Sequence, residues 1–355
     1  MKRITVRAEI SSRLDIIFGV KMKILVSCPK GKTFDSFFDT QNCRLAESLG
    51  EVVWNPFAVN FSPEKAVRLI EGCDVYMTTW GAPPLSAEML EAAPNLKLLA
   101  HLGGDAQPFM SDAAWDAGVK VISGETLLLR SVAEGSIAYI LSSLRKIPEY
   151  SSRLKYKNEW RHSWDTNQGL VGKTVGIVNY SDVAAMLVRL LSPFGVNIMV
   201  YDDDPLPKGD VRKYKLVRSE LNHIFSQCDV ICVYTPKNRS GYHMIGSNQL
   251  SLIKKGALLV DVSSGGVVNH RSLAIILMNR RFFALLDVYE KEPPEYDKML
   301  FLNENVTLMP HMAGPTPDTR LLIAKTLLLE SAGFIEKGGR LNHRVYRKSG
   351  DAENN

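Results

Sequence analysis

The sequence predicts an α/β protein with two Rossmann-like or flavodoxin-like lobes, each built on a parallel sheet, and a cleft between them. Its 355 residues exceed one ordinary domain of about 150 residues, so two cores are expected. Hydrophobic residues make up 45% of the chain and charged residues 23%, the balance of a globular protein. In both halves short apolar runs alternate with helix-length segments, and strands separated by helices pair in parallel.

The first series of strands and helices begins at Lys23. Its expected strands are 23–27, 51–54, 74–79, 96–102 and 119–123, with helices near 38–50 and 63–71. A long helical stretch follows, roughly 131–155, in which apolar residues recur at helical spacing. This helix is expected to bridge the two lobes.

A second series begins at Thr174 and has the form of a six-strand Rossmann-like sheet. Its expected strands are 174–178, 197–202, 229–234, 257–262, 283–288 and 306–310, with helices near 182–193, 219–227, 247–254 and 271–279. A last helix, 319–337, would return the chain to the first lobe.

These patterns divide the chain into a discontinuous substrate-side domain and a nucleotide-side domain. The predicted substrate-side domain comprises 22–125 plus 320–345, and the Rossmann domain comprises 126–319. Residues 1–21 are expected to be an extension and 346–355 a tail. The first clear strand starts directly after Met22, which favours Met22 as the natural start.

Charge and cysteine usage narrow the class of protein. The net charge is +5 and the basic residues are scattered, so neither nucleic-acid binding nor attraction to a membrane surface is expected. No membrane-spanning stretch of roughly 20 apolar residues is expected, and no signal peptide is expected either. Five cysteines form no CxxC pair, which favours reduced thiols, no metal site and a cytoplasmic protein.

The loop after strand 174–178 stands where a dinucleotide-binding fingerprint, G-x-G-x-x-G, is expected. It reads Asn179, Tyr180, Ser181, Asp182, Val183 and Ala184, so all three glycines are replaced. Asn tolerates a positive φ and Ala is accepted at the third position, but Ser181 adds a side chain where the pyrophosphate approaches. Asp182 adds a negative charge to the same helix end. The alternative is that Ser181 and Asp182 simply cap the helix.

An aspartate follows the next strand at the position that selects between NAD and NADP. Asp202 lies about 20 residues beyond the loop, where a carboxylate accepts the ribose hydroxyls and disfavours a 2′-phosphate. If a dinucleotide binds, NAD is therefore expected. An Asp-rich turn before Pro205 is the alternative explanation.

Several longer segments, taken together, resemble the D-isomer-specific 2-hydroxyacid dehydrogenase family. The resemblance covers roughly 96–345, and its most specific pieces are VAE at 132–134, LLDVYEKEP at 285–293 and PHMAG at 310–314. It implies hydride transfer between NADH and C2 of a small 2-oxo acid, and a homodimer formed through the nucleotide domains.

The resemblance also assigns roles to individual residues. His311 matches the general acid, Glu292 its carboxylate partner, and Asp287 the aspartate beside the nicotinamide. A nearby carboxylate stabilises a protonated imidazole, which must give its proton to the substrate oxygen. The other implied cofactor contacts are Thr235, Pro236 and Val262.

The arginine that holds the substrate carboxylate in this family is missing. The family's motif Asn-x-Ala/Ser-Arg-Gly reads here Asp261 to Gly265, with Ser264 in place of the arginine. A serine offers one neutral hydrogen bond where an arginine offers a charged fork. Arg130 and Arg271 could compensate, although an exposed surface arginine is the simpler interpretation of each.

Two further departures lie in the first lobe. The family's Asn before the VAE helix is Leu128 here, and the glycine-containing substrate loop runs through Gly103 and Gly104 to Asp105. The two glycines can present backbone N–H groups to a carboxylate, whereas Asp105 brings the wrong charge.

Three functions remain open from the sequence. The first is an NAD-dependent oxidoreductase acting on a small 2-oxo or 2-hydroxy acid, impaired by the changes at Ser264 and in the glycine loop. The second is a catalytically inactive member that acts as a binding or regulatory protein. The third is proton chemistry by the His311–Glu292 pair on a less acidic substrate. His311 without the arginine could also be a structural residue.

Overall fold

The computed structural model describes residues 22–235, 241–279 and 282–347. The chain divides into two compact units, residues 1–128 with 315–355 (unit 1) and residues 129–314 (unit 2). The predicted boundaries, after 125 and after 319, differ from these by a few residues. The predicted extension 1–21 and most of the predicted tail lie outside the described residues.

Unit 1 contains a six-stranded sheet in the order β13-β5-β4-β3-β1-β2. All strands pair in parallel except β13, which runs antiparallel to β5 at the edge. The strands are β1 (Met22–Val26), β2 (Gly50–Trp54), β3 (Val75–Thr78), β4 (Leu98–His101), β5 (Lys120–Ser123) and β13 (Arg344–Val345).

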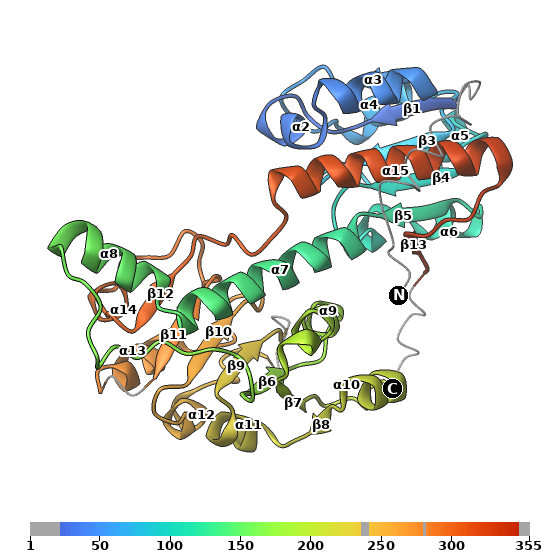
Figure 1. Cartoon of the computed structure of the whole chain (residues 1–355). Helices are drawn as coiled ribbons and strands as arrows, with labels where there is room; N and C mark the ends of the chain where they lie inside the picture. The colour runs from blue at the N-terminus through green and yellow to red at the C-terminus, as the bar shows by residue number, and fades with distance from the viewer. Residues whose placement is uncertain (1–21, 236–240, 280–281, 348–355) are drawn as a thin grey trace. The chain divides into compact units, whose positions relative to one another are not determined.

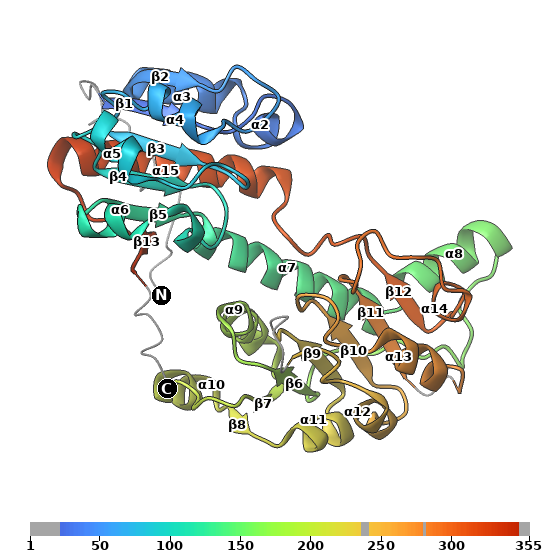
Figure 2. The same ribbon diagram turned by 180° about the vertical axis from the view of Figure 1, so that it is seen from behind.

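Helices cover both faces of the unit 1 sheet (Figure 1 and Figure 2). One apolar core lies under α2 (Lys32–Phe37), α3 (Thr40–Leu49) and α15 (Pro317–Lys337). The other lies under α4 (Pro63–Leu69), α5 (Ala87–Ala92) and α6 (Asp112–Asp116), with the short η1 (Gln107–Phe109) beside it. Because the sheet is buried on both sides, its strands read as continuous apolar runs.

Unit 2 contains a seven-stranded parallel sheet in the order β12-β11-β10-β9-β6-β7-β8. The strands are β6 (Thr174–Val178), β7 (Asn197–Tyr201), β8 (Val217–Arg218), β9 (Val230–Val233), β10 (Leu258–Asp261), β11 (Phe283–Leu286) and β12 (Val306–Leu308). The strand order reverses between β6 and β9, and ligands of such sheets bind at that switch point, beyond the carboxyl ends of the strands.

Two layers of helices enclose this second sheet (Figure 1). On one face lie α7 (Glu125–Leu144) and α9 (Asp182–Leu191), and on the other lie α11 (Leu221–Gln227), α12 (Ser247–Leu252) and α13 (His270–Leu277). The remaining elements are α8 (Ile147–Lys157), η2 (Ser192–Phe194), α10 (Lys208–Tyr214) and α14 (Lys298–Phe301). The prediction of two parallel-sheet α/β units is confirmed.

The prediction of one helix over 131–155 is wrong. The chain forms α7 and α8 instead, separated by Lys146 in the left-handed conformation at φ 52°. Pro148 lies in the first turn of α8, where its missing N–H costs no helical hydrogen bond but prevents one continuous helix.

By length and composition α7 could cross a bilayer. The expectation that no stretch is long and apolar enough is therefore wrong by this criterion. The criterion is weak evidence for a membrane span, because core helices of soluble proteins meet it too, and Ala133, Tyr139 and Ile140 of α7 pack into the unit 2 core.

Candidate functional site

The candidate residues of unit 2 follow the carboxyl ends of six parallel strands. They come after β6 (179–184), β7 (202), β9 (235), β10 (261–266), β11 (287–292) and β12 (311). Since these strands are parallel neighbours, their carboxyl ends share one edge of the sheet (Figure 1). The structure thus brings loops that are far apart in sequence to that edge.

The loop after β6 is bound to the aspartate after β7. Asp202 accepts hydrogen bonds from the backbone N–H of Tyr180 (2.5 Å) and from the amide of Asn179 (3.3 Å), and its other oxygen accepts from the N–H of Asp204 (2.8 Å). Asn179 adopts φ 70°, the left-handed conformation that a glycine would supply. A carboxylate accepts about four hydrogen bonds, so Asp202 retains capacity for a ribose hydroxyl.

The first turn of α9 departs most from a pyrophosphate site. Ser181 is the N-cap, and its hydroxyl accepts from the backbone N–H of Ala184 at 3.4 Å, so the capping interpretation describes its present contact. Asp182 is exposed in the first turn, where its charge opposes an anion. Ala184 is buried and Val183 packs beside it in the core, so these two support the helix from within.

Thr235 lies just beyond β9 and is buried. Its hydroxyl has no hydrogen-bond partner within the described part of the chain, which leaves a polar atom available at the switch point. Val262, after β10, is half-buried against the unit 2 core. Pro236 lies outside the described residues.

Taken together, these residues fit a dinucleotide at its ribose end better than at its pyrophosphate end. The Asp202 carboxylate is held in place by the loop it faces, whereas Ser181 and Asp182 occupy the helix terminus with a side-chain cap and a negative charge. When bound, NAD would supply or accept a hydride.

Ser264 is an exposed residue of a tight turn after β10. The turn continues through Gly265 and Gly266, at φ 73° and 76°. A Cβ at Gly265 would lie 2.3 Å from the backbone oxygen of Tyr289, so only glycine fits there. The two arginines that could replace the missing substrate arginine are both surface residues. Arg130 pairs with Glu134 on the surface of α7, and Arg271 is exposed on α13.

Beneath this turn Asp261 is a fully buried carboxylate. It accepts from the backbone N–H of Ser263 at 3.1 Å, while its Oδ2 finds no partner among the residues described. Burial raises the pKa of Asp261 to about 6, and the negative charge of Asp287 acts in the same direction. The burial of this carboxylate could not be predicted from the local sequence, in which an aspartate replaces the family's asparagine.

His311 and Glu292 form the pair that the resemblance implied. The Nδ1 atom of His311 lies 2.7 Å from Oε2 of Glu292, and the other oxygen of Glu292 accepts from the backbone N–H of Tyr289 at 3.1 Å. Their side chains are 58% and 37% exposed, so the pair is open to solvent. Because Nδ1 is engaged, Nε2 is the nitrogen available to a substrate.

Asp287 has a structural role that the sequence did not predict. It is buried, and its carboxylate accepts from the backbone N–H groups of Met312 (2.7 Å) and Ala313 (2.9 Å) and from the hydroxyl of Tyr139 (2.8 Å). These bonds fix the backbone next to His311. Asp287 therefore positions the loop that carries the acid.

The loop that carries His311 also packs against one face of α7. Ser131 donates to the backbone oxygen of Gly314 (3.3 Å), and a Cβ at Gly135 would lie 2.9 Å from the Cα of Ala313. With Tyr139, these residues recur every fourth position, on one side of the helix. Small residues at i and i+4, on either side of the VAE motif, are a sequence signal for this close packing. The packing was not predicted from the sequence.

The substrate loop belongs to unit 1 and follows β4. A Cβ at Gly103 would lie 2.4 Å from Nε2 of His101, so the glycine is required there. Asp105 is exposed and accepts from the backbone N–H of Gln107 at 3.0 Å. Leu128 packs against the unit 1 core, which explains an apolar residue at this position.

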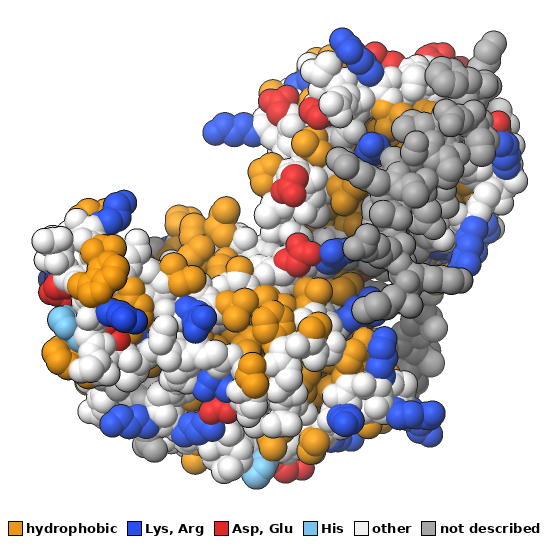
Figure 3. Space-filling view, in the orientation of Figure 1, with side chains coloured by type: hydrophobic (Ala, Val, Ile, Leu, Met, Phe, Trp, Pro, Cys, Tyr) orange, Lys and Arg blue, Asp and Glu red, His pale blue; other side chains and the backbone are white. Residues whose placement is uncertain are grey.

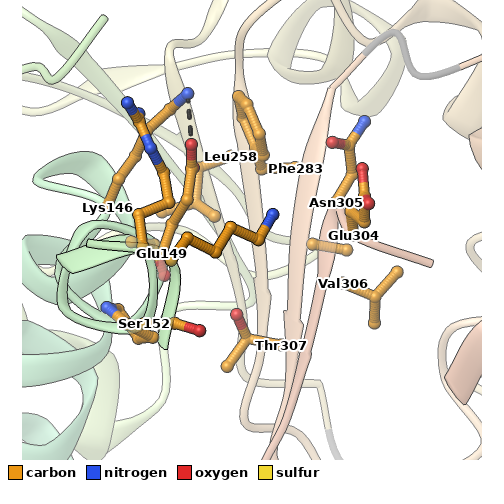
Figure 4. A pocket seen from close by; sticks show the side chains of 14 residues that line it. Lys146, Glu149, Ser152, Leu258, Phe283, Glu304, Asn305, Val306 and Thr307 are labelled. Atoms are coloured by element: carbon orange, nitrogen blue, oxygen red, sulfur yellow. Dashed lines mark ion pairs between the residues drawn. The ribbon is translucent and has the colours of Figure 1, made fainter. Parts of the chain in front are cut away.

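A cavity of about 580 Å³ lies in unit 2, away from these residues (Figure 4). Its lining includes Leu258, Phe283 and Val306, which begin β10, β11 and β12, together with Lys146 and Glu149. It therefore opens at the amino ends of the strands, opposite the edge that carries His311. In the described residues no group of three or more His, Cys, Asp or Glu side chains could hold a metal ion.

Comparison with known proteins agrees with this geometry. Residues 137–313 match the family model described as D-isomer specific 2-hydroxyacid dehydrogenase, NAD binding domain. The glyoxylate reductase of Thermococcus litoralis is 30% identical over 260 residues, covering 70% of this chain and 78% of that protein. The D-3-phosphoglycerate dehydrogenase of Methanocaldococcus jannaschii is 28% identical over 297 residues, but these are only 55% of its own length.

The fold is also found among solved structures. A phosphoglycerate oxidoreductase from Rhizobium etli superimposes with a TM-score of 0.77 at 20% identity, covering 93% of this chain and 99% of that one. The chain therefore belongs to the D-isomer-specific 2-hydroxyacid dehydrogenase family, and its unit 2 is that family's NAD-binding domain.

Proposed function

We propose that this protein is an NAD-dependent oxidoreductase that acts on a small 2-oxo or 2-hydroxy acid with reduced efficiency. The observation that carries the proposal is the 2.7 Å contact between His311 and Glu292 at the carboxyl edge of a family NAD-binding domain. An acid with a carboxylate partner in that place is what carbonyl reduction needs.

Each residue of the candidate site has its own role in the proposed hydride transfer. Glu292 binds Nδ1 of His311 and fixes the orientation of the ring, so that Nε2 can give a proton to the carbonyl oxygen or take it back. Asp287 fixes the backbone at Met312. Asp202 and the neighbouring acidic residues favour NAD, because they repel a 2′-phosphate.

Two changes reduce the expected efficiency. Ser264 offers no charge to a substrate carboxylate, and each charged hydrogen bond contributes about 1.5–3 kcal/mol. One such bond corresponds to roughly ten- to hundredfold in affinity. Asp182 weakens the hold on the pyrophosphate in the same sense.

A second candidate is a family member that no longer turns over substrate and acts by binding a ligand or a partner. The observation in its favour is that the substrate arginine and the phosphate loop have changed together. A change at the arginine alone would indicate a new substrate instead.

The deciding experiment is a titration of NADH into the purified chain, followed by fluorescence and by calorimetry. Saturation at micromolar NADH, followed by NADH oxidation with glyoxylate or hydroxypyruvate that is lost in His311→Ala, would support the oxidoreductase. No binding up to millimolar NADH would eliminate it and favour the second candidate.

We propose further that the protein is a cytoplasmic homodimer. Large apolar side chains are exposed on α8 and the segment after it, including Trp160 (70% exposed) and Trp164 (72%). Hydrophobic side chains also gather along α7 and at α8 on the face of unit 2 in Figure 3. Exposed apolar patches of this kind usually mark an interface.

Light scattering after gel filtration tests the dimer. The wild-type protein should elute as a dimer, and the double variant Trp160→Ser/Trp164→Ser should shift toward the monomer. The matched control is Tyr346→Ser, an exposed aromatic in unit 1. A monomeric wild-type protein would end the proposal.

A further inference from the structure

Unit 1 contains a half-buried cation, Arg320, for which the described residues provide no counter-ion. Arg320, in the second turn of α15, lies with its guanidinium carbon 5.8 Å from the ring centroid of Trp80 and 5.9 Å from that of Phe37. Its Nε is buried without a hydrogen-bond partner in the described chain, and its Nη1 makes only a long contact of 3.4 Å to the hydroxyl of Ser36. No carboxylate of the described residues lies within ion-pair distance of it.

A half-buried arginine without an opposite charge beside it is unusual. Buried charged groups are nearly always matched by an opposite charge or by several hydrogen bonds. The two aromatic rings hold the planar guanidinium without using its N–H donors. The rings thus hold the guanidinium in orientation, while most of its N–H donors have no partner among the described residues.

The same aromatic side chain connects Arg320 to the substrate loop. A Cβ at Gly103 would lie 3.0 Å from Nε1 of Trp80 and 2.4 Å from Nε2 of His101. The indole N–H, the imidazole and the backbone of Gly103 thus converge at one place. Trp80 remains 46% exposed, so this place is accessible.

The imidazole contributes a neutral group here. Burial lowers the pKa of His101 to about 4, and its Nδ1 lies 3.0 Å from the hydroxyl of Thr78. At neutral pH the positive charge beside Trp80 and Gly103 therefore comes from Arg320 and not from His101. Asp105, whose charge acts on His101, and Asp318 in the first turn of α15 oppose an anion.

We propose that Arg320 and Trp80, together with the turn at Gly103, bind the carboxylate of a small acid. The guanidinium supplies a charged fork, and α15 of unit 1 holds it. Naming this acid as the substrate rests on the proposed oxidoreductase function, whereas carboxylate binding by unit 1 does not.

The experiment uses oxalate as the probe and the full chain without NADH. Calorimetry, together with tryptophan fluorescence, should show saturable binding of oxalate. Arg320→Gln should weaken it at least tenfold, and Arg320→Lys, which keeps the charge without the fork, should weaken it less. Asp105→Asn should strengthen it. The matched control is Arg271→Gln, an exposed arginine on α13, with an expected change below twofold.

Thermal unfolding of each variant shows whether a loss of binding reflects a loss of folding. If Arg320→Gln is unfolded, the oxalate affinity of Arg320→Lys is compared with that of wild type instead. The proposal is overturned if wild type fails to bind oxalate, or if Arg320→Gln binds within twofold of wild type. Oxalate binding that depends on Arg320 without NADH oxidation would leave this site standing and remove the oxidoreductase. NADH oxidation that is unchanged in Arg320→Gln would support the oxidoreductase and show that the acid bound at Arg320 is not its substrate.

Discussion

The hydroxyl of Tyr139 donates a 2.8 Å hydrogen bond to the buried carboxylate of Asp287, which lies 148 residues further along the chain. The same carboxylate accepts from the backbone N–H groups of Met312 and Ala313. A single buried charge thereby ties α7, the end of β11 and the loop of His311 together.

Replacing Tyr139 with phenylalanine removes one of the three donors to this charge. We expect the free energy of unfolding to fall by about 1–3 kcal/mol, because a buried carboxylate then loses part of its compensation. Urea denaturation at pH 7 measures this. Tyr242→Phe, which removes an exposed hydrogen bond to Glu290, is the control and should cost much less. Equal losses in the two variants would contradict the proposed role of Asp287.

Asp261 should make stability depend on pH. Its pKa rises from 3.8 unfolded to about 6 folded, so the folded state holds the proton more tightly. Between about pH 4 and pH 6 its contribution therefore falls as pH rises. Asp261→Asn should be more stable than wild type at pH 7 by about 2–3 kcal/mol, with the difference vanishing near pH 4.

Thermal unfolding of both proteins from pH 4 to pH 8 tests this difference. The control is Asp203→Asn, an exposed aspartate in unit 2, which should give curves parallel to those of wild type. A gain for Asp261→Asn that is constant with pH would show that the carboxylate is not the cause.

Restoring an arginine at Ser264 should raise activity toward a 2-oxo acid. Ser264 is exposed in its turn, so a longer side chain fits without displacing the core. We expect kcat/KM for glyoxylate to rise at least tenfold in Ser264→Arg, and less in Ser264→Lys, which adds charge without the bidentate fork. An unchanged KM and kcat would place the substrate carboxylate elsewhere.

The first turn of α9 should limit the affinity for NADH. Asp182→Arg removes a negative charge and adds a positive one where the pyrophosphate approaches, so the Kd for NADH should fall about tenfold. Ser181→Gly should act in the same direction at little cost to the cap. Glu88→Arg makes the same charge change in the first turn of α5 and should have no effect. An equal effect of Glu88→Arg would indicate a general charge effect.

The sequence by itself determined the fold class and the place of the site. Apolar runs of strand length, separated by helices, require parallel sheets, and in parallel sheets the loops after the strands meet at one edge. His311 and Glu292 could be paired because their motifs are intact. The short elements β8, α10, α14 and β13 escaped prediction, since two to seven residues carry too little periodicity. The break at Lys146 was readable from Pro148 but was missed.

Tertiary structure alone decided which charges are buried and which side chains meet. Asp261, Asp287 and Asp202 all follow strands, and nothing in their local sequence separates the buried carboxylate without a full set of partners from the one held by three donors. The contacts of Tyr139 with Asp287 and of Arg320 with Trp80 join distant segments. Such contacts depend on which elements pack together, whereas the local pattern records only that each element has an apolar face.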